Sequence, residues 1–356
     1  EKHIINQNRT VRDALIKLDR VAPSSILFVV DEKNVLLGSL TDGDLRRGFI
    51  NGLGFENELL EFVKPNPTFI REHEHNLKEL EQYRKNLLKI IPIIDKRNVI
   101  IDILDFSSRQ TLIPADAVLM AGGEGKRLRP LTETTPKPLL KIGDKPIIEY
   151  NIDRLKQVGI STINLSINYL GEQLENYFGN GSDKEITINY VRETKPLGTI
   201  GSILLIDKFN HDDIIVMNSD LLTNIDFADF FRTYKDSKAD MAVATTSYHV
   251  DVPYAVLEVQ EDNIVKSLKE KPRWTYYSKA GIYILKKSIL KMIPFNQFFD
   301  ITDLMDRILE MNLKLITYPI NGYWLDIGKH EDFRKAQEDI KHIKLLMECF
   351  AGYYWQ

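Results

Sequence analysis

The sequence predicts an α/β protein, in which a Rossmann-like domain with a mixed, mostly parallel sheet follows a smaller α+β domain. Three observations predict this arrangement. Residues 26–40 and 90–104 repeat one pattern, strands alternate with helices after residue 116, and a glycine-rich loop follows the first of those strands. At 356 residues the chain is long enough for two or three domains. We expect domains at 1–107 and 117–356, joined by a linker at 108–116.

Composition and charge exclude several classes of protein. Lysine plus arginine is 47 and aspartate plus glutamate is 51, so the net charge of −4 indicates neither a nucleic-acid nor a membrane-surface partner. No apolar run approaches the roughly 20 residues that span a bilayer, and the first ten residues show no signal-peptide pattern. The single cysteine, Cys349, excludes an internal disulfide and a cysteine-based metal site. We expect a reducing, cytoplasmic compartment.

The N-terminal domain is expected to hold two copies of one unit. ILFVVDEKNVLLGSL and IIPIIDKRNVIIDIL align at an offset of 64, and each reads as strand, polar turn, strand. Apolar residues at helical spacing precede the first copy, with Thr10 and Asp13 marking a helix start, and NLKELEQYRKNL holds the same place before the second. Neither unit buries enough surface alone, so the two should pack as a pseudo-symmetric pair.

This organisation resembles a pair of cystathionine-β-synthase-type (CBS) domains over residues 1–107. The first copy ends in GSLTDGDLRR, and the resemblance implies that Thr41 and Asp44 contact the phosphate and ribose of AMP or ATP. In the second copy Asp102 replaces the glycine and Asp105 replaces the threonine, which argues against a second site. The alternative is that TDGD forms a turn and a helix cap, with the pair serving only oligomerisation.

Beyond the linker, strands are expected at AVLM, TINLSI, ITINYV, IIVM and MAVATT, which begin at residues 117, 162, 186, 214 and 241. Between the first two, Pro146 opens a helix and Gly159 closes it. Strands that alternate with helices favour a largely parallel sheet, and ligands bind beyond the carboxyl ends of such strands. Motifs at strand ends should therefore carry the chemistry.

A glycine-rich loop, AGGEGKRLRPLTETTPKPLL, follows the first of these strands. Its glycines permit tight, positive-φ backbone, and exposed N–H groups in such a turn bind anions. Arg127 can fork onto phosphate oxygens, and the flanking prolines hold Lys137 on a stiff segment. A Walker loop needs GxxxxGK[ST] and a Rossmann loop needs GxGxxG, so neither of these fingerprints is present.

The joint pattern GGxGxRLxPLT…PKPLL resembles the signature of sugar-1-phosphate nucleotidyltransferases, and the resemblance spans residues 115–345. It implies that Arg127 and Lys137 act in catalysis and that Asp220 and Asp326, in NSDLL and YWLDIGKHEDF, bind Mg²⁺. It implies nucleotide contacts from a further set of residues: Leu119, Ala121, Gly122, Gly123, Gly125, Asn168, Gly198 and Thr199.

The resemblance also implies where the sugar phosphate binds. In VKSLKEKPRW, Glu270 would contact sugar hydroxyls and Lys271 the sugar phosphate, and Gly281 would contribute to the wall beside the sugar. Ala255 stands where the family has a glycine, so its methyl group would narrow that side of the pocket.

The expected reaction joins a nucleoside triphosphate to a sugar 1-phosphate, in a homo-oligomer that serves surface-glycan synthesis. The order of the domains resembles that of bacterial enzymes that make GDP-sugars, and this resemblance implies GTP with glucosamine 1-phosphate. The alternatives are mannose-1-phosphate guanylyltransferase and glucose-1-phosphate uridylyl- or thymidylyltransferase. A non-catalytic adenine-nucleotide sensor is a further alternative, disfavoured because Arg127, Lys137, Asp220, Lys271 and Asp326 are all present. The GGxG spacing disfavours an NAD-dependent dehydrogenase.

Overall fold

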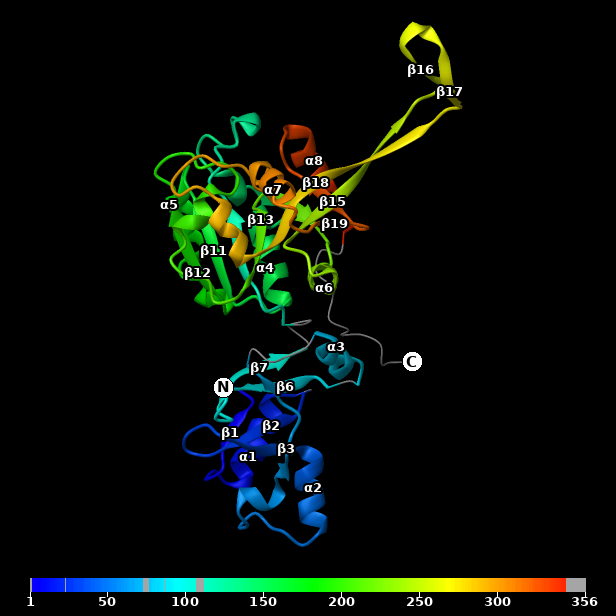
Figure 1. Ribbon diagram of the computed structural model, residues 1–356. Helices are drawn as coiled ribbons and strands as arrows, with labels where there is room; N and C mark the ends of the chain where they lie inside the picture. The colour runs from blue at the N-terminus through cyan, green and yellow to red at the C-terminus, as the bar shows by residue number, and fades with distance from the viewer. Residues whose placement is uncertain (1, 23, 73–76, 87, 107–111, 344–356) are drawn as a thin grey trace. The chain divides into compact units, whose positions relative to one another are not determined.

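The computed structural model describes residues 2–22, 24–72, 77–86, 88–106 and 112–343. It divides into two compact units, with the boundary between Leu112 and Ile113 (Figure 1). Within the described ranges, no helix has the length and apolar character that a membrane crossing requires.

The N-terminal unit contains the two predicted copies of helix plus hairpin. Its strands form two sheets, ordered β1-β2-β3-β4 and β5-β6-β7, and in each the hairpin is antiparallel. The elements are β1 Ile4–Asn6, α1 Val11–Arg20, β2 Ile26–Val30, β3 Leu36–Thr41, α2 Asp42–Ile50, β4 Lys64–Pro65, β5 Ile70–Arg71, α3 Leu77–Lys85, β6 Ile90–Ile94 and β7 Ile100–Asp105.

The two hairpins meet through a reciprocal pair of hydrogen bonds. Leu36 N donates to Asn98 O at 2.9 Å, and Ile100 N donates to Asn34 O at 3.0 Å. Each residue of one bond lies 64 positions from its equivalent in the other, which is the offset of the repeat. Both asparagines have positive φ, near +60°, a conformation that asparagine tolerates in tight turns. The pseudo-symmetric packing expected from the repeat is therefore present at this contact.

Helix starts in this unit follow the sequence. Thr10 caps α1: its hydroxyl accepts from Asp13 N at 3.1 Å, and the Asp13 carboxylate accepts from Thr10 N at 3.2 Å. Thr41 and Asp44 form the same capping box at the start of α2. The turn-and-cap interpretation of TDGD is thus confirmed, whereas adenylate binding by these two side chains stays a prediction.

The C-terminal unit is built on a seven-stranded sheet ordered β12-β11-β8-β13-β18-β15-β19. The first four strands are parallel, β18 runs antiparallel to both of its neighbours, and β15 and β19 are parallel. The mixed, mostly parallel sheet agrees with the prediction. Its strands are β8 Asp116–Met120, β11 Thr162–Ile167, β12 Thr187–Arg192, β13 Asp213–Asn218, β15 Met241–Asp251, β18 Arg273–Lys286 and β19 Leu315–Pro319.

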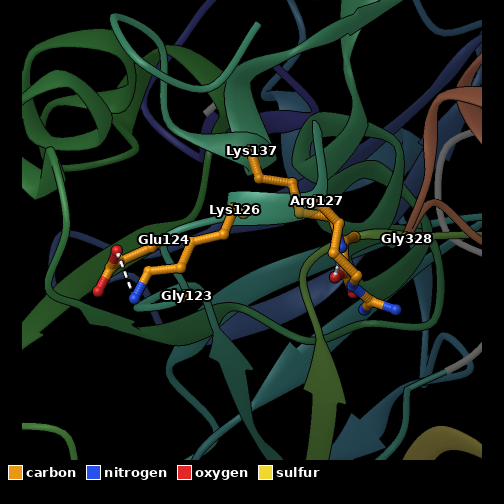
Figure 2. A pocket seen from close by; sticks show the side chains of 8 residues that line it. Gly123, Glu124, Lys126, Arg127, Lys137 and Gly328 are labelled. Carbon is orange, nitrogen blue, oxygen red and sulfur yellow. Dashed lines mark hydrogen bonds and ion pairs between the residues drawn. The ribbon is translucent and has the colours of Figure 1, made fainter. Parts of the chain in front are cut away.

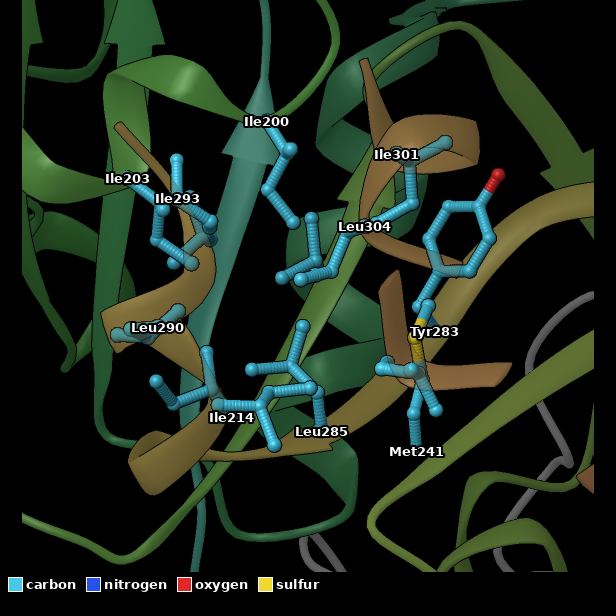
Figure 3. Close-up of a cluster of buried hydrophobic side chains, with 14 of the residues drawn as sticks. Ile200, Ile203, Ile214, Met241, Tyr283, Leu285, Leu290, Ile293, Ile301 and Leu304 are labelled. Atoms are coloured by element: carbon cyan, nitrogen blue, oxygen red, sulfur yellow. The ribbon is translucent and has the colours of Figure 1, made fainter. Parts of the chain in front are cut away.

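Helices pack on this sheet and complete its core. They are α4 Ile147–Gln157, α5 Gly171–Phe178, α6 Phe227–Ser237 and α7 Ile301–Glu310. A further helix, α8 His330–Asp339, packs instead against the short strands Lys141–Ile142 and Trp324–Asp326. One cluster of buried side chains joins the central strands to α7 and to the segment around Ile200 (Figure 3). Ile214, Leu285 and Leu304 in that cluster are fully buried. Burial of these apolar faces holds the carboxyl ends of the parallel strands in fixed positions.

Three short ribbons complete the unit. They are β9 Lys141–Ile142 with β10 Lys145–Pro146, β14 Leu221–Thr223 with β20 Trp324–Asp326, and β16 Val256–Val259 with β17 Val265–Lys269. The last of these ends a long arm, formed where β15 and β18 continue past the sheet (Figure 1). The sequence predicted β15 only to residue 246, and the arm was not expected.

The linker prediction needs correction at its C-terminal end. Residues 107–111 lie outside the described ranges, but Leu112, Ile113, Ala115 and Asp116 are buried. Ile113 N donates to Val158 O at 2.8 Å, and the Asp116 carboxylate, at the start of β8, accepts from His211 N at 2.8 Å. These four residues are therefore packed parts of the fold instead of an exposed connection.

Candidate active site

The glycine-rich loop leaves the carboxyl end of β8 and turns into a short 3-10 helix, Lys126–Leu128. Gly125 makes that turn with a φ of +63°, which disfavours any side chain. The Thr132 hydroxyl donates to Gly125 O at 2.8 Å and fixes the turn. An added Cβ at Gly122 would lie 3.1 Å from Glu193 Oε1, whereas one at Gly123 would meet nothing within 4 Å. Gly123 therefore presents open backbone to a ligand.

The cations of the loop point in two directions (Figure 2). Lys126 Nζ lies 3.2 Å from Glu124 Oε2, and Arg129 lies 3.8 Å from the same atom. Arg127 extends the other way, toward Gly328, where an added Cβ would lie 3.3 Å from its Nη2. Because Gly328 has no side chain, the guanidinium can lie against it, and both residues line the same cavity.

Lys137 and the two predicted metal-binding aspartates converge beside this loop. Lys137 Nζ donates to Asp220 Oδ2 and lies 4.0 Å from Asp326 Oδ1. The ribbon of β14 and β20 brings the aspartates together, because Leu221 pairs with Asp326 and Ile327 N donates to Asp220 O at 3.1 Å. Two carboxylates that are 106 positions apart in the chain thus share one ammonium group.

The aspartate pair has the chemistry of a divalent-cation site. Asp220 Oδ1 and Asp326 Oδ1 are buried and have no hydrogen-bond partner among the residues that the structure describes. Such an arrangement is unfavourable unless a cation is bound. Burial, followed by the nearby charge of Asp220, raises the pKa of Asp326. No group of three or more potential ligand side chains occurs among the described residues. Two carboxylates with open positions suit Mg²⁺, which keeps several waters and binds phosphate oxygens.

Asn168, Gly198 and Thr199 line a second cavity of about 370 Å³ next to the first. Thr199 is held by Asp300, whose Oδ1 accepts from Thr199 N at 2.9 Å and from its hydroxyl at 3.0 Å. Gly198 has a φ of +78°, and an added Cβ would lie 2.5 Å from Phe299 O. These contacts fix the segment against the start of α7, and the three predicted nucleotide-binding residues share one wall.

Two predicted nucleotide-binding residues line neither of the two cavities. Leu119 is fully buried, Ala121 is buried with its N–H donating to Ser166 O at 2.8 Å, and Met120 lines the cavity between them. Alternate residues of a strand face opposite sides of the sheet, so the side chain of Met120 points away from the side that its neighbours face. A contact from the side chain of Leu119 is excluded by its burial.

The residues predicted to bind the sugar phosphate lie in two different parts of the unit. Gly281, with a φ of +73°, lies against Asn218, which lines the second cavity. Ala255, Glu270 and Lys271 instead lie in the arm, beyond the sheet, and none of them lines either cavity (Figure 1). The structure therefore does not bring these three residues together with the rest of the site.

Several lining residues were not predicted from the sequence: Met120, Pro138, Glu193, Pro196, Leu197, Asn218, Ser219 and Phe298. Glu193 is central among them, because it accepts from Ser166 Oγ at 2.7 Å and from Leu197 N at 3.1 Å. Its position directly after β12 could have indicated it, as could the position of Asn218 at the end of β13. Phe298 follows no such strand and carries no comparable signal.

Comparison with known proteins gives consistent matches. The family model described as nucleotidyl transferase matches residues 116–343. A probable mannose-1-phosphate guanylyltransferase 3 from Oryza sativa subsp. japonica is 34% identical over 225 residues, which are 61% of this chain and 62% of that protein. The chain thus spans less than two thirds of the length of that relative.

Two further relatives are covered almost completely. The D-glycero-alpha-D-manno-heptose 1-phosphate guanylyltransferase of Aneurinibacillus thermoaerophilus is 32% identical over 233 residues, 64% of this chain and 99% of that protein. A crystal structure of a putative glucose-1-phosphate thymidylyltransferase from Bacillus anthracis, in complex with a sucrose, has a TM-score of 0.53 at 24% identity. It covers 66% of this chain and 98% of that one, and it supports the fold.

Proposed function

This chain belongs to the nucleotidyl transferase family, and from that premise we propose that it joins a sugar 1-phosphate to a nucleoside triphosphate. An oxygen of the sugar phosphate attacks the α-phosphorus, the bond to the β-phosphate oxygen breaks, and pyrophosphate leaves. One observation carries this proposal: Lys137, Asp220 and Asp326 meet beside a loop of open backbone and cations.

The site supplies what this reaction requires, which is positioning and charge neutralisation without a covalent intermediate. Open backbone at Gly123 and the Arg127 guanidinium would hold the triphosphate, and Lys137 would stabilise charge on the reacting phosphate. Nucleotidyl transferases generally use a divalent metal, and we assign Mg²⁺ to Asp220 and Asp326. When bound, that ion would neutralise phosphate charge beyond what the side chains supply.

We propose GTP and glucosamine 1-phosphate as the substrates. The order of the domains suggests this pair, and the rice and Aneurinibacillus relatives are named as guanylyltransferases. Mannose 1-phosphate with GTP is the second choice, because the rice relative is named for that sugar. Glucose 1-phosphate with UTP or dTTP is the third, because a Synechocystis relative, 27% identical over 263 residues, is named as a UTP–glucose-1-phosphate uridylyltransferase.

We also propose that the N-terminal unit is a CBS pair that binds an adenine nucleotide and regulates or assembles the enzyme. The reciprocal bonds between the two hairpins and the shared helix-plus-hairpin order support this proposal.

The test is a matrix of four nucleoside triphosphates against glucose, glucosamine, mannose and N-acetylglucosamine 1-phosphates, scored by release of pyrophosphate. We expect turnover with GTP and glucosamine 1-phosphate that requires Mg²⁺ and is lost with a chelator. Asp220→Asn should lower turnover by at least about 100-fold. Asp183→Asn, at an exposed position remote from both cavities, is the control and should leave turnover unchanged. If no combination releases pyrophosphate, the chain is not the enzyme proposed.

A further inference from the structure

The two aspartates that are proposed to hold the metal lie on strands that the core fixes to different degrees. Asp220 directly precedes β14, whose three residues are all buried. Asp326 ends β20, whose three residues are only half-buried. Packing therefore fixes the position of Asp220. The position of Asp326 relative to it depends more on the hydrogen bonds that join the two strands.

The ladder between these strands is short. The paired residues are Leu221 with Asp326, Leu222 with Leu325 and Thr223 with Trp324. A two-stranded ribbon is at best marginally stable in water, so this one needs further bonds to stay closed at its ends. At the end beside the cavity, Ile327 N donates to Asp220 O at 3.1 Å.

The opposite end of the ribbon is closed by Asn224 and Tyr323. Asn224 N donates to Tyr323 O at 3.0 Å. The Asn224 side chain adds a second bond, because Tyr323 N donates to Asn224 Oδ1 at 2.6 Å. We call these two bonds the clamp. The clamp satisfies a backbone N–H and a backbone C=O that lie just beyond the three pairs of the ladder.

Gly322 leaves the space that the clamp needs. An added Cβ at Gly322 would collide with Asn224 Oδ1 and would lie 2.9 Å from Asn224 Cγ. The three atoms nearest to that Cβ all belong to the side chain of Asn224. Gly322 does not have a positive φ, so the fold uses its missing side chain here and not a special backbone conformation.

We propose that the clamp sets the separation of Asp220 and Asp326, and thereby the affinity of the site for a divalent cation. This inference rests on the proposed function, which assigns the ion to these aspartates. Asn224 is a positioning residue, because four residue steps separate it from Asp220 and span about 13 Å at the rise of a strand. Oxygen ligands of Mg²⁺ must lie at about 2.0 to 2.1 Å from the ion, so a small shift of β20 against β14 lowers the affinity.

The test measures binding of Mn²⁺ alone to the full chain by electron paramagnetic resonance, without nucleotide or sugar phosphate. Asn224→Leu removes the acceptor for Tyr323 N at a similar side-chain volume. It should raise the Kd for Mn²⁺ at least about tenfold, as expected for a residue that orients metal ligands. Asn224→Asp keeps an acceptor oxygen and should stay within about threefold of wild type. An Asn224→Leu chain that binds Mn²⁺ as tightly as wild type overturns the proposal.

A double-mutant cycle separates the clamp from a general loss of stability. Gly322→Ala and Asn224→Ala should each raise the Kd for Mn²⁺ about tenfold, the first by displacing the Asn224 side chain and the second by removing it. In the double variant the added methyl group has no side chain left to displace. Its Kd should therefore match that of Asn224→Ala within about threefold. Two effects that multiply in full contradict the clamp.

Asp240→Asn is the matched control for stability. Asp240 accepts hydrogen bonds from Lys286 Nζ and Lys314 N at the edge of the large sheet. Its substitution should destabilise the chain and leave the Kd for Mn²⁺ unchanged. Asp220→Asn should abolish Mn²⁺ binding and so locate the ion. If the wild-type chain binds no Mn²⁺, or if Asp220→Asn binds it normally, the proposal fails.

These measurements need no turnover, so the clamp and the proposed reaction can fail separately. If Asn224→Leu weakens Mn²⁺ binding, the clamp is supported even where no pair of substrates releases pyrophosphate. If the wild-type chain is active and Asn224→Leu leaves the Kd for Mn²⁺ unchanged, the reaction is supported and the clamp is not.

Discussion

At the scale of single residues, two glycines of the active-site loop differ in whether the fold requires them. Gly125 needs its positive φ, and an added Cβ would lie 3.0 Å from Thr132 Cγ2 and 3.1 Å from Lys137 Cβ. Gly123 has neither constraint. The two positions are two residues apart in one loop. Substitutions at them therefore distinguish the effect of the backbone conformation of glycine from the effect of its missing side chain.

Gly125→Ala is expected to lower the free energy of unfolding by about 1 to 2 kcal/mol, because an L-residue is strained in this conformation. It should also lower kcat/KM at least tenfold, through displacement of Lys137 by a few tenths of an ångström or more. Gly123→Ala should change the free energy of unfolding by less than about 0.5 kcal/mol. Urea unfolding of both variants measures the difference, and equal losses of stability would refute this account of the turn.

At the scale of elements, the strands of the large sheet are joined by charged side chains as well as by backbone bonds. Asp240 immediately precedes β15, and its Oδ1 accepts from Lys286 Nζ at 2.7 Å, at the end of β18. Its Oδ2 accepts from Lys314 N at 2.9 Å, directly before β19. The hydrogen bond from Lys286, followed by that from Lys314, lowers the pKa of Asp240. One carboxylate therefore joins three neighbouring strands at the end of the sheet opposite the arm.

Asp240→Asn is expected to destabilise the protein by about 1.5 to 3 kcal/mol at pH 7, the range for a hydrogen bond to a charged group. Because the pKa of Asp240 is lower in the folded than in the unfolded chain, its contribution is complete above the unfolded value, near 3.9. The contribution is lost as the pH falls through the folded value. The difference between the two proteins in urea unfolding should therefore be constant from pH 7 to 5 and shrink below pH 4. A difference that persists unchanged at pH 3 would exclude this ion pair as the cause.

At the scale of the whole molecule, the chain joins a two-copy unit to a transferase unit. In the first unit, Thr10 and Thr41 cap α1 and α2 with the same capping box. The CBS resemblance assigns a ligand only to Thr41. Because the two caps are alike, substitutions of Thr10 and Thr41 can be compared directly. The comparison distinguishes a role of Thr41 in ligand binding from its role in helix stability.

AMP or ATP at 100 times its dissociation constant is expected to stabilise the folded protein by about 2.7 kcal/mol. Thr41→Ala and Thr10→Ala should each lose about 1 kcal/mol without nucleotide, from the missing cap. Only Thr41→Ala should also lose the stabilisation by nucleotide. Thermal unfolding with and without AMP measures both effects, and a wild-type protein that AMP and ATP leave unshifted would disprove the adenylate site.

Much of the fold was predictable from consecutive residues. The offset of 64 predicted the paired hairpins, and periodicity placed β11 at Thr162–Ile167 as the structure has it. The resemblance to sugar-1-phosphate nucleotidyltransferases implied that Arg127, Lys137, Asp220 and Asp326 act together, and the structure brings these residues close to one another. The paired hairpins and the bounds of β11 depend on local backbone preferences, which a few neighbouring residues determine.

The tertiary structure alone decided how distant segments meet. It paired β14 with β20 so that Asp220 and Asp326 share Lys137, and it turned Met120 instead of Leu119 toward the second cavity. It also continued β15 and β18 past the sheet and carried Glu270 and Lys271 away from the site. The physical reason is that pairing between distant strands is selected by the total surface that packing buries. That quantity belongs to the assembled fold and to no single stretch of the chain.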